Sequence, residues 1–303
     1  MRWTVKQALF CLIGSTSLTL LLSWGGFSLY RDWKVKRMTS SEYRIISIIQ
    51  TGEEKGALKT AYLAELLHLS VDEPSQLYAF DLRQAQAKLL SSPLISEAKV
   101  KRIPPGTLYI DYKVRKPVAM LADYANTAID KEGYLFPAAP FLSPKQLPEI
   151  YLGLPPFGAS QDAMGRKGGQ WRTPLQNRHL ALAFEVWEFL QEFHQLDGMR
   201  VQRIDVSNAF APSLGQREIV VKIEDELILQ RSEKELVCIF PKLLRLAPKD
   251  HRLQLSNFFS LRRNMLDDYR RQLATLNEGG LFALRIIDLR IPQLAFIDTF
   301  KNP

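Results

Sequence analysis

The sequence is poor in the residues from which reactive sites are commonly built. Among 303 residues it has two cysteines and four histidines. Cys11 lies inside an apolar run, so we do not expect it to form a structural disulfide with Cys238. No histidine lies at metal-ligand spacing from a Cys, Asp or Glu. The four histidines are His68, His179, His194 and His251. The sequence therefore predicts no metal site and no cofactor.

Two common catalytic signatures are also missing. No glycine-rich loop opens a helix in the manner of a phosphate site, and no G-x-S-x-G nucleophile motif occurs. Neighbouring carboxylates do occur, at Asp267-Asp268 and at 224–226, but we assign both groups to polar faces where their charge is solvated. The sequence thus predicts a protein that works by binding and not by catalysis.

The charge of the chain does not by itself identify a partner. The net charge is +8 and the isoelectric point is near 9.4, values that raise a nucleic-acid hypothesis. The basic residues, however, are spread along the chain, and acidic or apolar residues interrupt each local cluster, so no nucleic-acid partner is expected. With 46% hydrophobic and 24% charged residues the chain is expected to fold, into about two domains.

One long apolar run, 8–30, contains no charged residue. As a helix it spans about 34 Å, enough to cross a hydrocarbon core of about 30 Å. A cleaved signal peptide is the alternative, because Arg2 and Lys6 precede the run, but its exit lacks a small-x-small cleavage motif. We predict an uncleaved transmembrane helix at 8–30, after a short tail (1–7) and before a polar linker (31–43). Basic residues flank the run on both sides and are more numerous after it, so charge counting does not support an N-inside orientation and leans slightly against it.

The segment 44–116 has the pattern of a small β-α-α-β-β domain. Between 108 and 115 apolar and charged residues alternate, which is typical of a strand with one buried face. Asp81 precedes a helical stretch and Gln84 follows three residues later, so Asp81 is predicted to cap that helix. Pro93 lies beyond the end of the helix. One sheet covered by two helices is the expected fold.

The remainder, 117–303, is predicted to be a β-rich domain with added helices, which makes the chain an α+β protein. A hairpin is expected around 131–133. We predict helices near 174–196, 233–246 and 260–277. The first of these should begin at a capping box formed by Thr173 and Gln176.

The helix near 260–277 allows two arrangements. Its apolar stripe can pack on the second domain, which we favour, or the helix can lie on a bilayer with arginines at the headgroups. The stripe consists of Met265, Leu266, Tyr269 and Leu273. The arginines are Arg262, Arg263, Arg270 and Arg271.

With these elements in place, the chain resembles the FtsQ/DivIB family of bacterial cell-division proteins, whose first extracytoplasmic domain is a POTRA module. The matching positions are Asp81, Leu89, Pro93, Ile95, Ala98, Val100, Arg102, Pro105, Leu108, Ile110, Arg115, Pro117, Val118, Ala119, Ile129, Asp130, Gly133 and Phe136. We expect the motif residues to be structural. The stretch 287–297, "IDLRIPQLAFI", resembles the closing strand pair of the family, whereas the helical stretch 247–276 looks longer than the family requires.

The resemblance implies a non-enzymatic scaffold of the divisome, held by one helix in the inner membrane at the division septum. Its N-terminus would lie in the cytoplasm and its folded part in the periplasm, with partners similar to FtsB, FtsL and FtsK. Because sheet edges can accept an added strand, we hypothesise that a partner strand docks near 284–298, and that the POTRA sheet offers a second surface. The candidate contact residues are Arg285, Ile287, Asp288, Leu289, Arg290, Leu294 and Phe296.

Two other functions are alternatives. A POTRA-type outer-membrane assembly factor should carry several such modules and a barrel-length remainder, neither of which is evident here. A membrane-anchored periplasmic enzyme of the envelope would need a site assembled from scattered residues. Turnover of peptidoglycan fragments, abolished by one carboxylate substitution, would identify such an enzyme.

Overall fold

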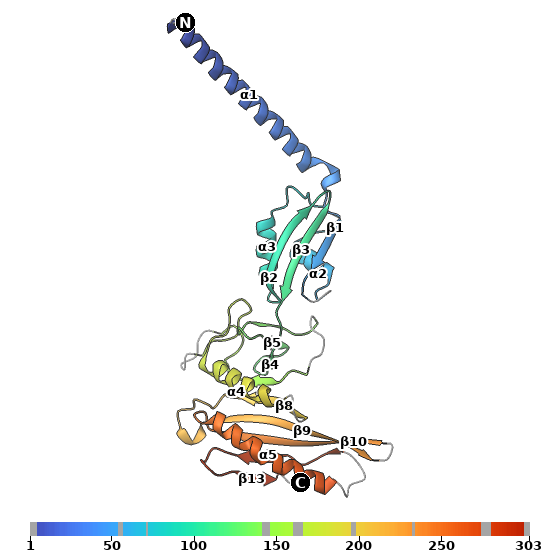
Figure 1. Cartoon of the computed structure of the whole chain (residues 1–303), viewed down its shortest axis with the longest axis vertical. Coiled ribbons are helices and arrows are strands. Elements are labelled where there is room, and N and C mark those ends of the chain that lie inside the picture. Colours follow the sequence, from blue (N-terminus) through green and yellow to red (C-terminus); the bar gives the residue numbers. More distant parts are fainter. Residues whose placement is uncertain are drawn as a thin grey trace. The chain divides into compact units, whose positions relative to one another are not determined.

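The computed structural model describes residues 5–53, 57–70, 72–140, 146–159, 166–194, 198–231, 234–273 and 280–299 (Figure 1). It describes the side chains of the first helix from Gly14 onward. The chain divides into two compact units, 1–114 and 115–303, which are taken one at a time below.

The first unit begins with a long helix, α1 (Val5–Thr39), followed by the short helix η1 (Ser41–Tyr43). The polar segment 31–43, predicted to be a linker, is helical over most of its length because α1 continues to Thr39. No glycine or proline interrupts this stretch, and two basic residues in the last turn suit the negative end of the helix dipole.

The predicted membrane span lies within α1. Where the structure describes side chains, no helix combines the length and the apolar character needed to cross a membrane. Residues 8–13 of the predicted span lie outside that described part.

The rest of the first unit has the predicted β-α-α-β-β order. Its elements are β1 (Ser47–Thr51), α2 (Thr60–Leu66), α3 (Leu82–Leu90), β2 (Ile95–Ile103) and β3 (Thr107–Val114). The sheet order is β1-β3-β2, with β1 parallel and β2 antiparallel to the central strand β3. Both β1 and β2 are therefore edge strands.

Local chemistry explains these elements. Asp81 caps α3 as predicted, since its carboxylate accepts the N–H groups of Arg83 at 2.8 Å and Gln84 at 3.1 Å. In β3 the predicted alternation is confirmed, because Leu108, Ile110 and Tyr112 are buried and the residues between them are not. These side chains form the core beneath the two helices.

The second unit is built on one large mixed sheet. Its strands are β4 (Ala119–Leu121), β5 (Thr127–Ile129), β6 (Leu135–Pro137), β7 (Glu149–Tyr151), β8 (Met199–Asp205), β9 (Ile219–Arg231), β10 (Lys234–Leu246), β11 (Gly280–Leu281), β12 (Arg285–Asp288) and β13 (Phe296–Thr299). The strand order is β13-β12-β10-β9-β8-β7-β4-β5-β6, and β11 also pairs with β10. The helices are α4 (Arg178–His194) and α5 (His251–Leu273), with the short η2 (Leu214–Gln216). The predicted hairpin is formed by β5 and β6.

The predicted helix at 233–246 is wrong, because this segment is the long strand β10. It pairs with β9 along its whole length, and every second side chain from Cys238 to Leu246 is buried. Pro241 is tolerated because its missing N–H faces the side where pairing changes from β11 to β12. The pattern Ser232-x-x-Glu235 is a capping signal that favours a helix here, and long-range pairing has overridden it.

The predicted capping box at Thr173 is also wrong, since α4 begins five residues later. Asn177 caps the helix instead, by accepting the N–H of Leu180 on its side-chain oxygen at 2.7 Å. Before the helix, Leu175 donates its N–H to the carbonyl of Gly133 at 2.7 Å. This contact draws the segment before α4 onto the β5–β6 hairpin.

Helix α5 starts earlier than the predicted 260–277, and 274–277 lie outside the described residues. It packs against β10 and reaches β9 through the pair of Arg262 with Asp225 (Figure 1). The stripe of Met265, Leu266, Tyr269 and Leu273 is buried in the core, so the arrangement packed on the domain is confirmed. The arrangement on a bilayer with Arg262 at the headgroups is wrong, because Arg262 is only 4% exposed.

The assignment of Asp225 to a solvated face is wrong as well. Asp225 lies on the buried side of β9 and is fully buried. Its carboxylate pairs with Lys242 of β10 and, at 2.7 Å, with Arg262 of α5. This triad of buried charges ties the helix to the sheet.

Candidate functional site

The two ends of the large sheet differ in their ability to accept another strand. At one end, β6 is three residues long, finishes at Pro137 and has Leu135 and Phe136 fully buried. The loop before α4 also bonds to the hairpin beside β6, through the Leu175–Gly133 contact. Short length, proline and cover are the usual protections of an edge strand. Among the described residues, this end is therefore less suited than β13 to accept an added strand.

At the other end, β13 is exposed. It pairs with β12 on one side, and no strand among the described residues pairs with its other side. Phe296 is 67% exposed and Ile297 is 42% exposed. An open edge with large apolar side chains is typical of a surface that another chain covers.

The hydrogen bonds of β12 show which groups of β13 face outward. Leu289 donates its N–H to the Arg245 carbonyl of β10 at 2.9 Å. Backbone groups alternate along a strand, so the even-numbered residues of β12 face β13, where they pair with Phe296 and Asp298. It follows that the N–H and C=O of Ile297 point away from the sheet, ready to bond an added strand.

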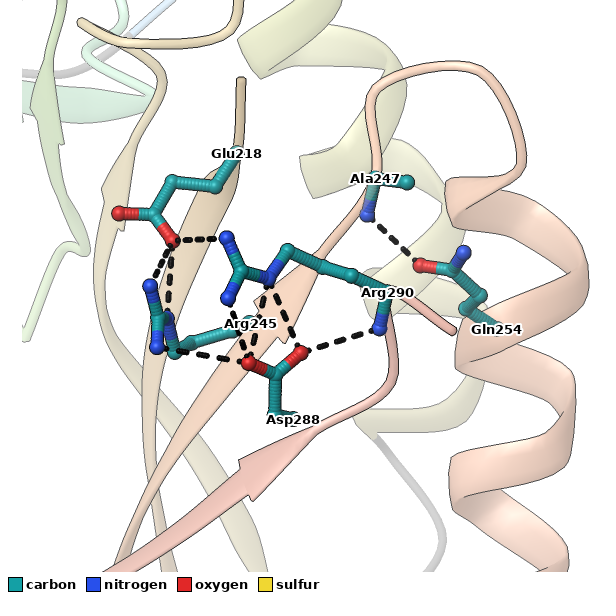
Figure 2. A network of polar contacts seen from close by, with 6 residues as sticks. All are labelled: Glu218, Arg245, Ala247, Gln254, Asp288 and Arg290. Atoms are coloured by element: carbon teal, nitrogen blue, oxygen red, sulfur yellow. Dashed lines mark hydrogen bonds and ion pairs between the residues drawn. The ribbon is translucent and has the colours of Figure 1, made fainter. Parts of the chain in front are cut away.

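A network of ion pairs and hydrogen bonds links β12, the strand that pairs with β13, to the neighbouring strands of the sheet (Figure 2). Asp288 and Arg290 form a forked pair, with Nε–Oδ1 at 3.0 Å and Nη2–Oδ2 at 2.7 Å. Glu218, just before β9, forms ion pairs with Arg245 at 2.7 Å and with Arg290 at 3.2 Å. These ion pairs join β9, β10 and the end of β12, and so fix the strand on which β13 is built.

The predicted contact residues Asp288 and Arg290 are thus engaged within the chain. Burial raises the pKa of the Asp288 carboxyl, but the hydrogen bonds and charge of Arg290 outweigh it, and its pKa lies below the usual 3.8. A carboxyl whose pKa is depressed by folding stabilises the fold above its unfolded pKa and loses that contribution as the pH falls.

The Asp288→Asn variant should therefore be less stable than the natural protein at neutral pH, by about 2 kcal/mol for the lost charged hydrogen bonds. The difference should shrink as the pH falls below about 4, where the natural carboxyl takes up its proton. Urea unfolding at a series of pH values measures it. A difference that does not change with pH would contradict the assigned role.

A groove lies beside the edge, between α5 and the loop that joins β12 to β13. Its volume is about 520 Å³. Leu253 and Leu261 of α5 line one wall and Leu294 the other, with the buried Leu289 also lining it. Gln254 anchors this part of α5, since its side-chain oxygen accepts the N–H of Ala247 at 2.8 Å (Figure 2). Apolar side chains next to an open strand can receive those of a partner.

The remaining predicted contacts fall in different places. Ile287 is fully buried, so it belongs to the core and not to a docking surface. Arg285 is half-buried, with its guanidinium 5.0 Å from the Tyr269 ring centroid. Leu294 and Phe296 are exposed at the groove and the edge. Sequence reasoning missed Ile297, although the alternation after Leu294 could have indicated its position.

The motif residues of the second unit have structural surroundings. Arg115 pairs with Asp130 at 2.8 Å and lies over the Tyr134 ring, 3.7 Å from its centroid. Asp130 also accepts the N–H of Tyr134 at 2.8 Å. Gly133 has φ of +87°, and a Cβ there would lie 2.7 Å from the carbonyl oxygen of Leu175.

The other motif residues lie in or near the first unit. Asp81 caps α3, and Ala98 is buried in β2. Val100 is half-buried in the same strand, and Pro93 lies between α3 and β2. Pro117 follows the end of β3 and lies in the second unit, before β4.

Comparison with known proteins identifies the first domain. Residues 57–111 match the family model described as POTRA domain, FtsQ-type. A search of the curated proteins finds no match. The matched residues include α2, α3, β2 and most of β3. The chain contains an FtsQ-type POTRA domain followed by a β-rich C-terminal domain, an arrangement consistent with the FtsQ/DivIB family.

Proposed function

We propose that this protein is a non-enzymatic scaffold of the bacterial divisome. The FtsQ-type POTRA domain at 57–111 supports a role in cell division. The uncharged run 8–30 supports a single membrane anchor, and the POTRA-type domain and the C-terminal unit follow it. In this proposal the N-terminus lies in the cytoplasm, the helix crosses the inner membrane at the septum, and the POTRA-type domain and the C-terminal unit lie in the periplasm.

The partner surface is the open edge of β13 together with the groove beside it. The outward-facing backbone of Ile297 supplies hydrogen bonds to an added strand, and the groove receives apolar side chains of the same partner. Division proteins similar to FtsB, FtsL and FtsK are the proposed partners. The observation that carries this proposal is an open edge at β13 on a sheet whose other end, among the described residues, is less suited to accept an added strand.

The POTRA sheet is the proposed second surface. Its edge strands β1 and β2 each pair only with β3 among the described strands. The exposed face of β2 carries Lys99 and Lys101, which favours a partner segment with acidic residues.

Photo-crosslinking in living cells tests the proposal. A crosslinking amino acid at Phe296, which is 67% exposed, should capture a division protein. The same amino acid at Leu214, which is 77% exposed in η2, should capture none. A reporter fused after Pro303 should be active only in the periplasm. Equal capture from both positions would contradict the edge, and cytoplasmic activity of the reporter would contradict the orientation.

A further inference from the structure

One end of the POTRA-type domain carries an exposed apolar turn beside basic residues. Ile46 is 83% exposed and Ile103 is 40% exposed. The two segments meet because Ile46 donates its N–H to the Gly106 carbonyl at 2.9 Å. We call this surface the proximal surface, and it consists of Arg44, Ile46, Lys101, Ile103, Pro104 and Pro105.

Close packing fixes the backbone that carries the proximal surface. Gly106 is buried, and a Cβ placed there would lie 2.3 Å from the Arg44 carbonyl oxygen. The β2–β3 turn therefore packs directly against the strand that leads into β1. The exposed side chains of the surface are presented by fixed backbone and not by a loose loop.

The same end of the domain is joined to α1. The Arg37 guanidinium lies 3.8 Å from the ring centroid of Trp33 and 5.1 Å from that of Tyr78. Tyr43, in η1, packs edge-on against Tyr78 with centroids 5.1 Å apart. These aromatic and cation–π contacts connect the last turn of the helix to the domain, and Arg44 follows η1 directly.

Helix geometry places this end near a membrane if the run 8–30 is the anchor. The helical residues after Tyr30 continue to Thr39, a rise of about 14 Å. The headgroup layer on each side of the hydrocarbon core is about 5–7 Å thick. The remaining gap of about 7–9 Å is close to the reach of extended Arg and Lys side chains, and helix tilt shortens it.

We propose that the proximal surface contacts anionic phospholipid headgroups next to the anchor. Ile46 and Ile103 enter the interface, while Arg44 and Lys101 bind phosphate groups and outnumber the nearby carboxylate of Glu42. This inference rests on the proposed membrane anchor. This contact orients the POTRA-type domain with its proximal surface toward the bilayer. The opposite end of the domain can then contact other proteins.

Depth measurement in vesicles tests the contact. The full chain carrying Cys11→Ser and Ile46→Cys is labelled with a polarity-sensitive fluorophore, and Cys238 is too buried to react. It is reconstituted into phosphatidylcholine vesicles with or without phosphatidylglycerol, and doxyl-labelled lipid serves as the quencher. We expect a blue-shifted, quenched probe at position 46 when phosphatidylglycerol is present. A probe at Leu214→Cys should stay in water.

Charge variants give the matched control. Each basic residue near an anionic surface contributes about 1 kcal/mol, so Arg44→Gln with Lys101→Gln should weaken the contact about 30-fold. Lys59→Gln with Arg83→Gln removes the same charge from exposed positions elsewhere on the domain and should leave the contact unchanged. The inference would be overturned if both pairs of substitutions weakened the contact equally. It would also be overturned if the probe at position 46 stayed in water although the vesicles retained the protein. Failure of the protein to float with vesicles would instead overturn the anchor.

Discussion

Replacing Asp225 by asparagine should lower the free energy of unfolding of the C-terminal unit by about 3–5 kcal/mol. The Asp225 carboxylate accepts hydrogen bonds from Lys242 Nζ and, at 2.7 Å, from Arg262 Nε. Asp225 and Lys242 are fully buried and Arg262 nearly so. The variant would keep two buried cations beside each other without the carboxylate that compensates them.

The stability of the Asp225→Asn variant should increase as the pH rises. Burial lowers the pKa of Lys242 below its usual 10.5, and Asp225 opposes that shift. Without the carboxylate the pKa of Lys242 should fall further. A lysine whose pKa is lower in the folded state favours folding more as its proton is lost, so the variant should regain stability as the pH rises.

Two controls make the test specific. Asp267→Asn removes an exposed pair with Arg270 and should cost less than about 1 kcal/mol. Replacing Asp225, Lys242 and Arg262 together by Leu, Met and Met should recover most of the stability, because no buried charge is left. Urea unfolding followed by tryptophan fluorescence measures these effects. A loss for Asp225→Asn as small as that for Asp267→Asn would contradict the role of the triad.

In the proposed function, the triad would also support the partner surface. It ties α5 to β9 and β10, and one wall of the groove is the α5 surface that includes Leu253 and Leu261. Close by, Tyr269 stacks on Phe240 with ring centroids 4.0 Å apart, which adds to the attachment. A chain that loses the triad should therefore lose the shape of the groove before it loses the sheet.

Sequence patterns were sufficient for the POTRA-type domain. Its strands and helices are short, and the signals that predict them are local: the alternation in β3 and the Asp81 cap. Because each element is determined largely by its own residues, the order β-α-α-β-β could be predicted.

The second unit was harder to predict because its decisive contacts join residues far apart in sequence. β10 carries a helix-like start signal, but pairing with β9 makes it a strand. In the sequence, Asp225 resembles a solvated carboxylate. Its partners, Lys242 of β10 and Arg262 of α5, are brought next to it only by the fold. The candidate edge was predicted in the right region, but which residues face inward and which outward depends on the β12–β13 register.

Replacing Ile297 by proline should weaken the binding of a division partner to the β13 edge at least about tenfold. The N–H of Ile297 points away from β12, so proline removes a donor that only an added strand would use. Ile297→Ala loses the same side chain but keeps the N–H, and is the matched control. Both variants should unfold at similar temperatures.

The affinity of the natural chain, Ile297→Ala and Ile297→Pro for the periplasmic segment of an FtsB-like protein tests the central claim most directly. We predict that the alanine variant binds nearly as well as the natural chain and that the proline variant binds at least about tenfold more weakly. Equal binding by the alanine and proline variants, both folded, would show that no strand is added at this edge and would contradict the account.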